Sequence, residues 1–144
     1  MTKILIGIDT GVNTGFAVAF DHGEGGVLQK VESLSITQAM QSVLEYEDEH
    51  DLKDIMLYIE DARKRTWFTG GREKSQGVGS VKRDAQIWED WCTEQGLNFK
   101  MIHPAANATK KKVEDFKRMT GWTGRTNEHA RDAAMLVFKR YWKA

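Results

Sequence analysis

Two short apolar segments, residues 4–8 and 55–59, constrain the fold of this chain most strongly. Each is five residues long and has isoleucine at both ends, and such runs predict buried β-strands. Asp9 follows the first run directly, and Glu60 follows the second. The sequence therefore predicts two buried strands that each end in a carboxylate.

The other strands follow from the turns and helical segments between them. A turn at residues 10–15 connects the first strand to a strand at 16–20, which gives an antiparallel hairpin, and residues 27–34 alternate as a third strand should. A fifth strand is predicted at 98–102. The last two strands, 55–59 and 98–102, each follow a helical segment, and such crossover connections require parallel pairing.

Capping patterns and apolar periodicity place the first two helices. Ser35 and Gln38 match the capping-box pattern at a helix start. Ser80 is expected to cap a second helix, in which apolar residues recur every three or four positions, and Gly96 is expected to end it.

Two further helices close the chain. A basic helix is predicted near residues 109–119, and a last helix opens at Thr126 and keeps its apolar periodicity as far as Tyr141. The element order predicts an α/β fold with a mixed five-stranded sheet, three antiparallel strands then two parallel ones, flanked by helices. Without repeats or linkers, residues 1–144 are expected to form a single domain.

The composition excludes several classes of protein. The single cysteine, Cys92, can form neither an internal disulfide nor a four-cysteine zinc site. No apolar run is long enough to span a bilayer, and the residues after Lys3 do not form a cleavable signal. We therefore expect a soluble, intracellular protein without membrane contact.

The formal net charge is zero, but the basic residues are gathered in two segments. A glycine-rich stretch at 61–79 lacks periodicity, and a loop of this length in a small domain is usually functional or disordered. Both basic segments could be ordinary solvated faces, yet a neutral total can hide a strong local field. The basic residues are Arg63, Lys64, Arg65, Arg72, Lys74, Lys82 and Arg83 in the first segment and Lys110, Lys111, Lys112, Lys117 and Arg118 in the second.

A third acidic residue, Asp132, lies on the apolar side of the alanine-rich last helix. His129 and Glu128 precede it by three and four residues, so either can share its helical face. A lone acid at a strand end is usually a turn or cap residue, but carboxylates that converge repel one another unless they are protonated or a cation bridges them. Mg²⁺ is bound by a few carboxylates with waters and phosphate oxygens, and two such ions suit phosphodiester hydrolysis.

Taken together, these segments resemble the RuvC-type Holliday junction resolvases of the ribonuclease H-like superfamily. The resemblance covers the opening hairpin with its first acid, the strand-end Glu, the helix that helps form the family's dimer, a basic segment near the scissile phosphate, and the closing acidic helix. In chain order, the matching segments are residues 6–11 with 14–15, 59–60, 77–95, 104–111 and 129–134.

The resemblance implies a metal-dependent, structure-specific endonuclease, a crossover junction endodeoxyribonuclease acting in DNA recombination and repair. It implies two Mg²⁺ ions per site, with Mn²⁺ able to substitute, branched DNA as the partner and no nucleotide cofactor. The cytoplasm of a bacterial cell or of a phage-infected host is the expected location, and the chain is compact, as viral versions of the family are. The implied metal and catalytic residues are Asp9, Glu60, His129 and Asp132, with Glu128 as an alternative metal ligand to His129, and with Lys111 or Lys110 on the phosphate.

The resemblance and the charge pattern also imply DNA contacts and a homodimer. Trp67 and Phe68 follow three basic residues, so one ring could stack on exposed bases or could pack against the sheet. The helix at 80–95 is expected to form the dimer through Trp88 and Trp91, together with Ile87, unless both tryptophans fill the monomer core. The expected DNA-binding residues are Arg63, Lys64, Arg65, Trp67, Phe68, Arg72, Lys74, Lys82, Lys110, Lys111 and Lys112.

Three other functions compete with junction cleavage. Another nuclease on this fold could cut flaps, single strands or RNA–DNA hybrids, and a non-catalytic nucleic-acid-binding module would lack some of the acids. Actin-like and sugar-kinase ATPases share the opening hairpin, but they need two such domains around a cleft. Here all the expected acidic positions are filled, and one domain is predicted, which favours a nuclease.

Overall fold

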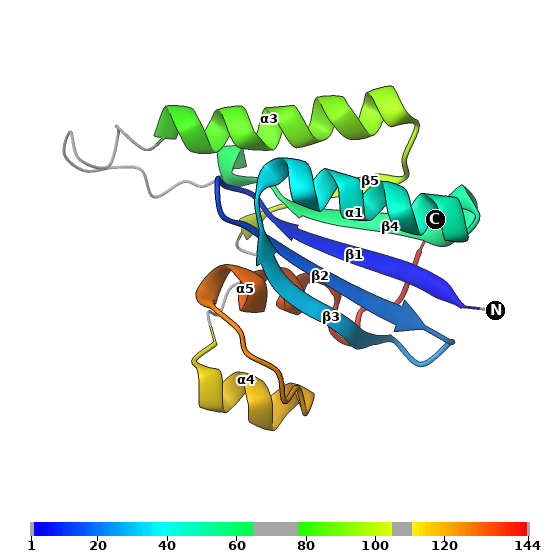
Figure 1. The fold of residues 1–144 in the computed structure, drawn as a ribbon, viewed down its shortest axis with the longest axis vertical. Helices are drawn as coiled ribbons and strands as arrows, with labels where there is room; N and C mark the ends of the chain where they lie inside the picture. Colours follow the sequence, from blue (N-terminus) through cyan, green and yellow to red (C-terminus); the bar gives the residue numbers. More distant parts are fainter. Residues whose placement is uncertain (1, 65–77, 105–110, 144) are drawn as a thin grey trace.

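A computed structural model describes residues 2–64, 78–104 and 111–143 of the chain. Its centre is a five-stranded sheet in the order β3-β2-β1-β4-β5 (Figure 1). The first three strands pair antiparallel, whereas β4 and β5 join β1 in parallel. The mixed sheet predicted from the sequence is therefore confirmed. The strands are β1 (Lys3–Asp9), β2 (Thr14–Asp21), β3 (Gly26–Leu34), β4 (Ile55–Glu60) and β5 (Phe99–Ile102).

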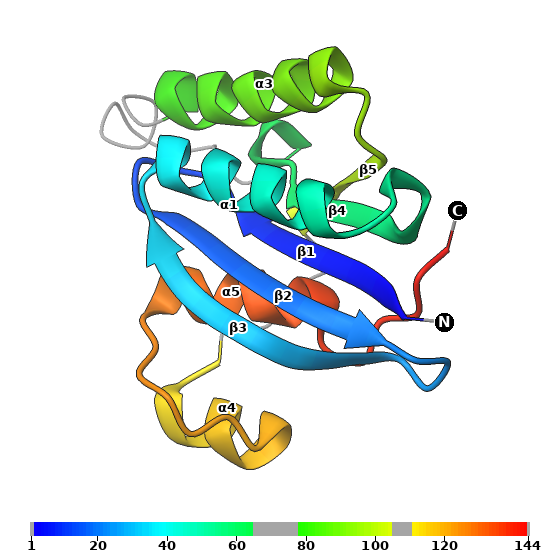
Figure 2. The ribbon, with the colours of Figure 1, turned by 45° about the vertical axis from the view of Figure 1, so that its right-hand side comes forward.

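Helices cover both faces of the sheet. α1 and α3 lie on one face, and α5 lies on the other with α4 beyond it (Figure 2). The predicted capping box of Ser35 and Gln38 is present at the start of α1. The helical segments are α1 (Ile36–Glu49), α3 (Val78–Gln95), α4 (Val113–Thr120) and α5 (Glu128–Val137), with short 3₁₀ turns η1 (Leu52–Asp54) and η2 (Ala62–Lys64).

Side-chain alternation along the strands divides the core in two. One cluster of buried side chains, which includes Ile6 and Leu57, packs beneath α1 and α3. The other, which includes Leu5 and Tyr58, packs against α5. Asp9 and Glu60 follow at even intervals from Leu5 and Tyr58, so both belong to the α5 face.

α5 lies unusually close to β1 and β2, because glycines face it. A Cβ atom on Gly7 would lie 2.2 Å from the Ala133 carbonyl oxygen, and one on Gly15 would lie 1.9 Å from the His129 carbonyl oxygen. Both distances are far below van der Waals contact. Only glycine at these two positions allows the helix backbone to rest directly on the sheet.

The helix boundaries differ from the predictions in three places. α4 begins at Val113, so Lys111 and Lys112 precede the helix that was predicted near residues 109–119. α3 begins at Val78, so Ser80 is its third residue and is not its N-cap. α5 ends at Val137 and does not continue to Tyr141, which is 55% exposed. The residues after Val137 instead run along the sheet, held by main-chain hydrogen bonds to Gly26.

Trp88 corrects part of the predicted dimer surface. Its side chain is completely buried within the monomer core, and Trp91 packs against the same cluster. The two rings make an edge-to-face contact with centroids 5.6 Å apart. The alternative in which the tryptophans fill the core is therefore correct for Trp88, whereas Ile87 on the same helix is 39% exposed.

A search of the described helices finds none with the length and apolar character needed to cross a membrane.

Candidate active site

The carboxylates of Asp9, Glu60 and Asp132 come together at one edge of the sheet. β1 and β4 are parallel neighbours in register at Ile8 and Ile59, so Asp9 and Glu60, the last residues of these strands, lie at the same end of the sheet. Asp9 is 7% exposed and Glu60 is 6% exposed. Asp132 reaches this edge from α5, which packs against both strands. The sequence placed these three residues on separate elements, and the fold brings them together.

The electrostatics of Asp9 reflect this convergence. Burial, together with the negative charges of Glu60 and Asp132, raises the pKa of Asp9 from its ordinary value of 3.8 to about 7. The hydrogen bond and the charge of His129 lower the pKa of Asp9. An aspartate that keeps its proton close to neutral pH is typical of a functional site.

His129 is the fourth member of this site. Its Nδ1 atom lies 3.2 Å from Oδ2 of Asp9, and its side chain remains 47% exposed. Glu128 is exposed in the first turn of α5, where the positive end of the helix dipole stabilises its negative charge. The contact with Asp9 places His129 at this group of acids, and the choice between His129 and Glu128 as a metal ligand stays a prediction.

The donor chemistry of these side chains fits a divalent cation. In the described part of the chain, no three Asp, Glu, His or Cys side chains are already arranged as a metal-ligand group. The fit therefore rests on chemistry: buried carboxylate oxygens that repel one another, with an imidazole beside them. A hard cation removes that repulsion, and Mg²⁺ also takes water and phosphate oxygens.

Arg131 anchors the main chain of Lys111 to α5. The Arg131 Nε atom donates to the Lys111 carbonyl oxygen at 2.9 Å, and its NH1 atom donates to Thr126 Oγ1 at 3.0 Å. Arg131 directly precedes Asp132 on α5. Sequence reasoning missed this arginine, although its place in the His-Ala-Arg-Asp motif was a usable signal. Lys112 is exposed next to Lys111, and Lys110 lies outside the described residues.

Arg63 occupies a different environment from the one predicted. Its guanidinium donates to both carboxylate oxygens of Asp61, at 2.8 and 2.9 Å, and its NH1 atom donates to Gln86 and Glu89 of α3 at 2.7 and 3.0 Å. These bonds tie η2 to α3, so the geometry favours a structural role for Arg63.

The other predicted DNA-binding residues are less constrained by the structure. Lys82 is exposed on α3. The side chain of Lys64 and residues Arg65, Trp67, Phe68, Arg72 and Lys74 lie outside the described part of the chain. The predicted choice between base stacking and core packing for the two aromatic residues stays a prediction.

The sheet order and the helices on its two faces define a ribonuclease H-like fold. No protein-family model matches the chain, and no curated protein does. Among solved structures, the chain is similar to T. thermophilus RuvC in complex with a Holliday junction substrate, with a TM-score of 0.55. The alignment has 15% sequence identity and covers 94% of this chain and 90% of RuvC. At this identity, the likeness concerns the fold.

Proposed function

We propose that this chain is a metal-dependent nuclease that cuts branched DNA such as Holliday junctions. The observation that carries the proposal is the meeting of Asp9, Glu60 and Asp132 at one edge of the sheet, with His129 in contact with Asp9. The similarity to T. thermophilus RuvC, whose structure was solved in complex with a Holliday junction substrate, supports branched DNA as the substrate.

The carboxylates would hold two divalent cations, with His129 as a further ligand. Bound there, Mg²⁺ supplies an activated water and neutralises the charge that develops on the phosphate. Asp9 orients the His129 ring through the contact at Nδ1. Lys111, positioned by Arg131, supplies a positive charge for the phosphate. Recombination and repair are the processes that such an activity would serve.

A cleavage panel tests the proposal. It compares a four-way junction, a flap, splayed arms, an RNA–DNA hybrid and plain duplex, each with Mg²⁺, Mn²⁺ or chelator. Paired cuts in the junction that require metal support the proposal. Preferred cutting of the flap, splayed arms or hybrid would assign another nuclease activity, and metal-dependent cutting of none of them would contradict the proposal.

His129 and Glu128 make distinguishable predictions. His129→Ala should lower the cleavage rate far more than Glu128→Ala, because His129 contacts Asp9. Mn²⁺ should serve at least as well as Mg²⁺, since imidazole suits the softer ion better. Single-turnover rates in both metals measure this, and the reverse order of the two variants would assign the ligand to Glu128.

Arg131 should act by positioning Lys111. Arg131→Ala is expected to lower the cleavage rate about ten-fold or more, because small displacements of a group near the reaction are costly. DNA binding should change only a few-fold. Arg118→Ala is the matched control, since it removes an equal charge from an exposed pair with Asp115. Equal rates for the two variants would show that Arg131 does not position the site.

We also propose a homodimer, since a junction must be cut on two strands. The surface of α3 around the exposed Ile87 is the expected interface, without Trp88. Sedimentation at micromolar concentration should give about twice the 16.4 kDa mass of the chain, and Ile87→Glu should reduce it to the monomer. A monomeric wild type that makes symmetric paired cuts would contradict this prediction.

A further inference from the structure

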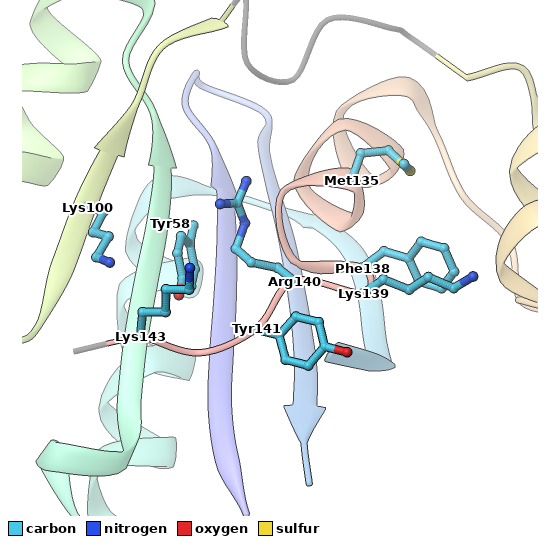
Figure 3. A pocket seen from close by; sticks show the side chains of 8 residues that line it. All are labelled: Tyr58, Lys100, Met135, Phe138, Lys139, Arg140, Tyr141 and Lys143. Atoms are coloured by element: carbon cyan, nitrogen blue, oxygen red, sulfur yellow. The ribbon is translucent and has the colours of Figure 1, made fainter. Parts of the chain in front are cut away.

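A basic pocket opens on the α5 face of the sheet (Figure 3). Its volume is about 400 Å³. Strand β5 contributes Lys100, and the segment after α5 contributes Lys139, Arg140 and Lys143. The side chains that line it include four basic residues and no acidic one. We refer to this site as the basic pocket.

The segment that closes the basic pocket is firmly attached to the sheet. The Lys139 N–H donates to the Gly26 carbonyl at 2.8 Å, and the Gly26 N–H donates to the Arg140 carbonyl at 2.8 Å. The Trp142 N–H donates to Asp21 at 2.9 Å. Lys139 has a φ of 58°, which is rare for a residue other than glycine and indicates a backbone held by its surroundings.

The floor of the basic pocket is polar and prearranged. The Arg140 guanidinium carbon lies 4.8 Å from the centre of the Tyr58 ring. The Tyr58 hydroxyl is buried beside the main chain of Lys143. An anion in the basic pocket would therefore meet several cationic groups above this ring.

The basic pocket adjoins the acidic site along two elements. Tyr58 precedes Glu60 by two residues on β4, which is about 7 Å along the same face. Met135 lines the basic pocket three residues after Asp132, about one turn along α5. The two sites are therefore neighbours on one face, one acidic and one basic.

We propose that the basic pocket binds a backbone phosphate of the DNA strand beside the phosphate that reacts. This inference rests on the proposed function. Every nucleotide brings a negative charge, and phosphate contacts fix the register of DNA on a protein. The acidic site suits only the phosphate that shares its metal ions, so a neighbouring phosphate needs a cationic partner. Lys100 on β5 and Arg140 in the segment that is hydrogen-bonded to Gly26 supply the cationic groups.

The test compares Lys100→Gln with Lys30→Gln in the full chain. Lys30 lies on β3, the outer strand on the side of the sheet opposite β5, and Lys30→Gln removes the same charge as Lys100→Gln. Junction binding in chelator should weaken about ten-fold or more for Lys100→Gln and less than two-fold for Lys30→Gln. The slope of log K against log salt should fall by about one for Lys100→Gln, as expected for one lost phosphate contact. Thermal melting checks that both variants fold.

A methylphosphonate scan assigns the contact to a single phosphate. Neutralising the phosphates beside the cleavage site one at a time should weaken binding by the wild type at one position, and Lys100→Gln should be insensitive at that position. Equal binding and equal salt slopes for the two lysine variants would overturn the proposal that the basic pocket binds a phosphate. A wild type that binds junction but cannot cut it would instead contradict the nuclease proposal, so the two failures are distinguishable.

Discussion

Replacing Asp9 with Asn is expected to abolish cleavage and, without metal, to stabilise the protein at neutral pH. Asn keeps the shape of the side chain but removes the charge that would bind a cation. The same charge opposes folding, because burial and two neighbouring carboxylates raise the pKa of Asp9 to about 7. Cleavage should fall below detection, while DNA binding changes only a few-fold.

The sign of the stability effect depends on pH. In the unfolded chain, Asp9 loses its proton near 3.8, whereas in the folded protein it keeps it up to about 7. The stability of the wild type should therefore decline as pH rises from about 4 to 7, and Asp9→Asn should escape this decline. With chelator at pH 8, the variant should melt about 5 °C or more above the wild type.

Asp54 provides the matched control. Its carboxylate lies 2.6 Å from Lys3 Nζ, and this hydrogen bond lowers the pKa of Asp54. Asp54→Asn should therefore keep full cleavage activity and should not gain stability at pH 8. Cleavage by Asp9→Asn at near wild-type rate, or a melting temperature that stays below that of the wild type at pH 8, would contradict the assigned site.

Gly15→Ala is expected to have the largest effect on folding. The added methyl group would lie 1.9 Å from the His129 carbonyl oxygen and 2.6 Å from its carbon, so α5 must move. Overpacking usually costs about 1–3 kcal/mol, and a clash with the backbone of α5 should cost about 3 kcal/mol or more. Cleavage should also fall, because α5 carries His129 and Asp132. Urea denaturation and cleavage rates measure the two effects.

Gly79→Ala is the control for this substitution. No atom lies within 4 Å of the position that its Cβ would take, and the residue is in the first turn of α3. Alanine favours helix over glycine by up to about 1 kcal/mol, so this variant should be as stable as the wild type or slightly more stable. Equal stability of Gly15→Ala and the wild type would show that α5 does not rest on the sheet as described.

The sheet was predictable because strand signals here are local. The apolar runs that became β1 and β4, the turn before β2 and the capping box of α1 are all visible over a few residues. Parallel pairing followed from the crossovers alone. Asp9 and Glu60 could each be recognised as an acid at the end of an apolar run, but the spacing alone could not show that the two acids converge.

Other features depend on contacts between distant residues and were not predictable. Trp88 looked available for an interface, but its burial depends on which face α3 turns to the sheet. Arg63 looked free for DNA, yet acceptors on α3 more than twenty residues away bind it. The apolar periodicity predicted that the last helix continues to Tyr141. α5 instead ends at Val137, and Lys139 and Arg140 form main-chain hydrogen bonds with Gly26.

The close seating of α5 on Gly7 and Gly15 also has a consequence for biosynthesis. Asp9 and Glu60 are translated well before His129 and Asp132, which belong to α5. Until α5 has been translated and has docked, the candidate site lacks two of its four side chains. A nascent chain that has not yet reached α5 therefore cannot assemble the site proposed for cleavage.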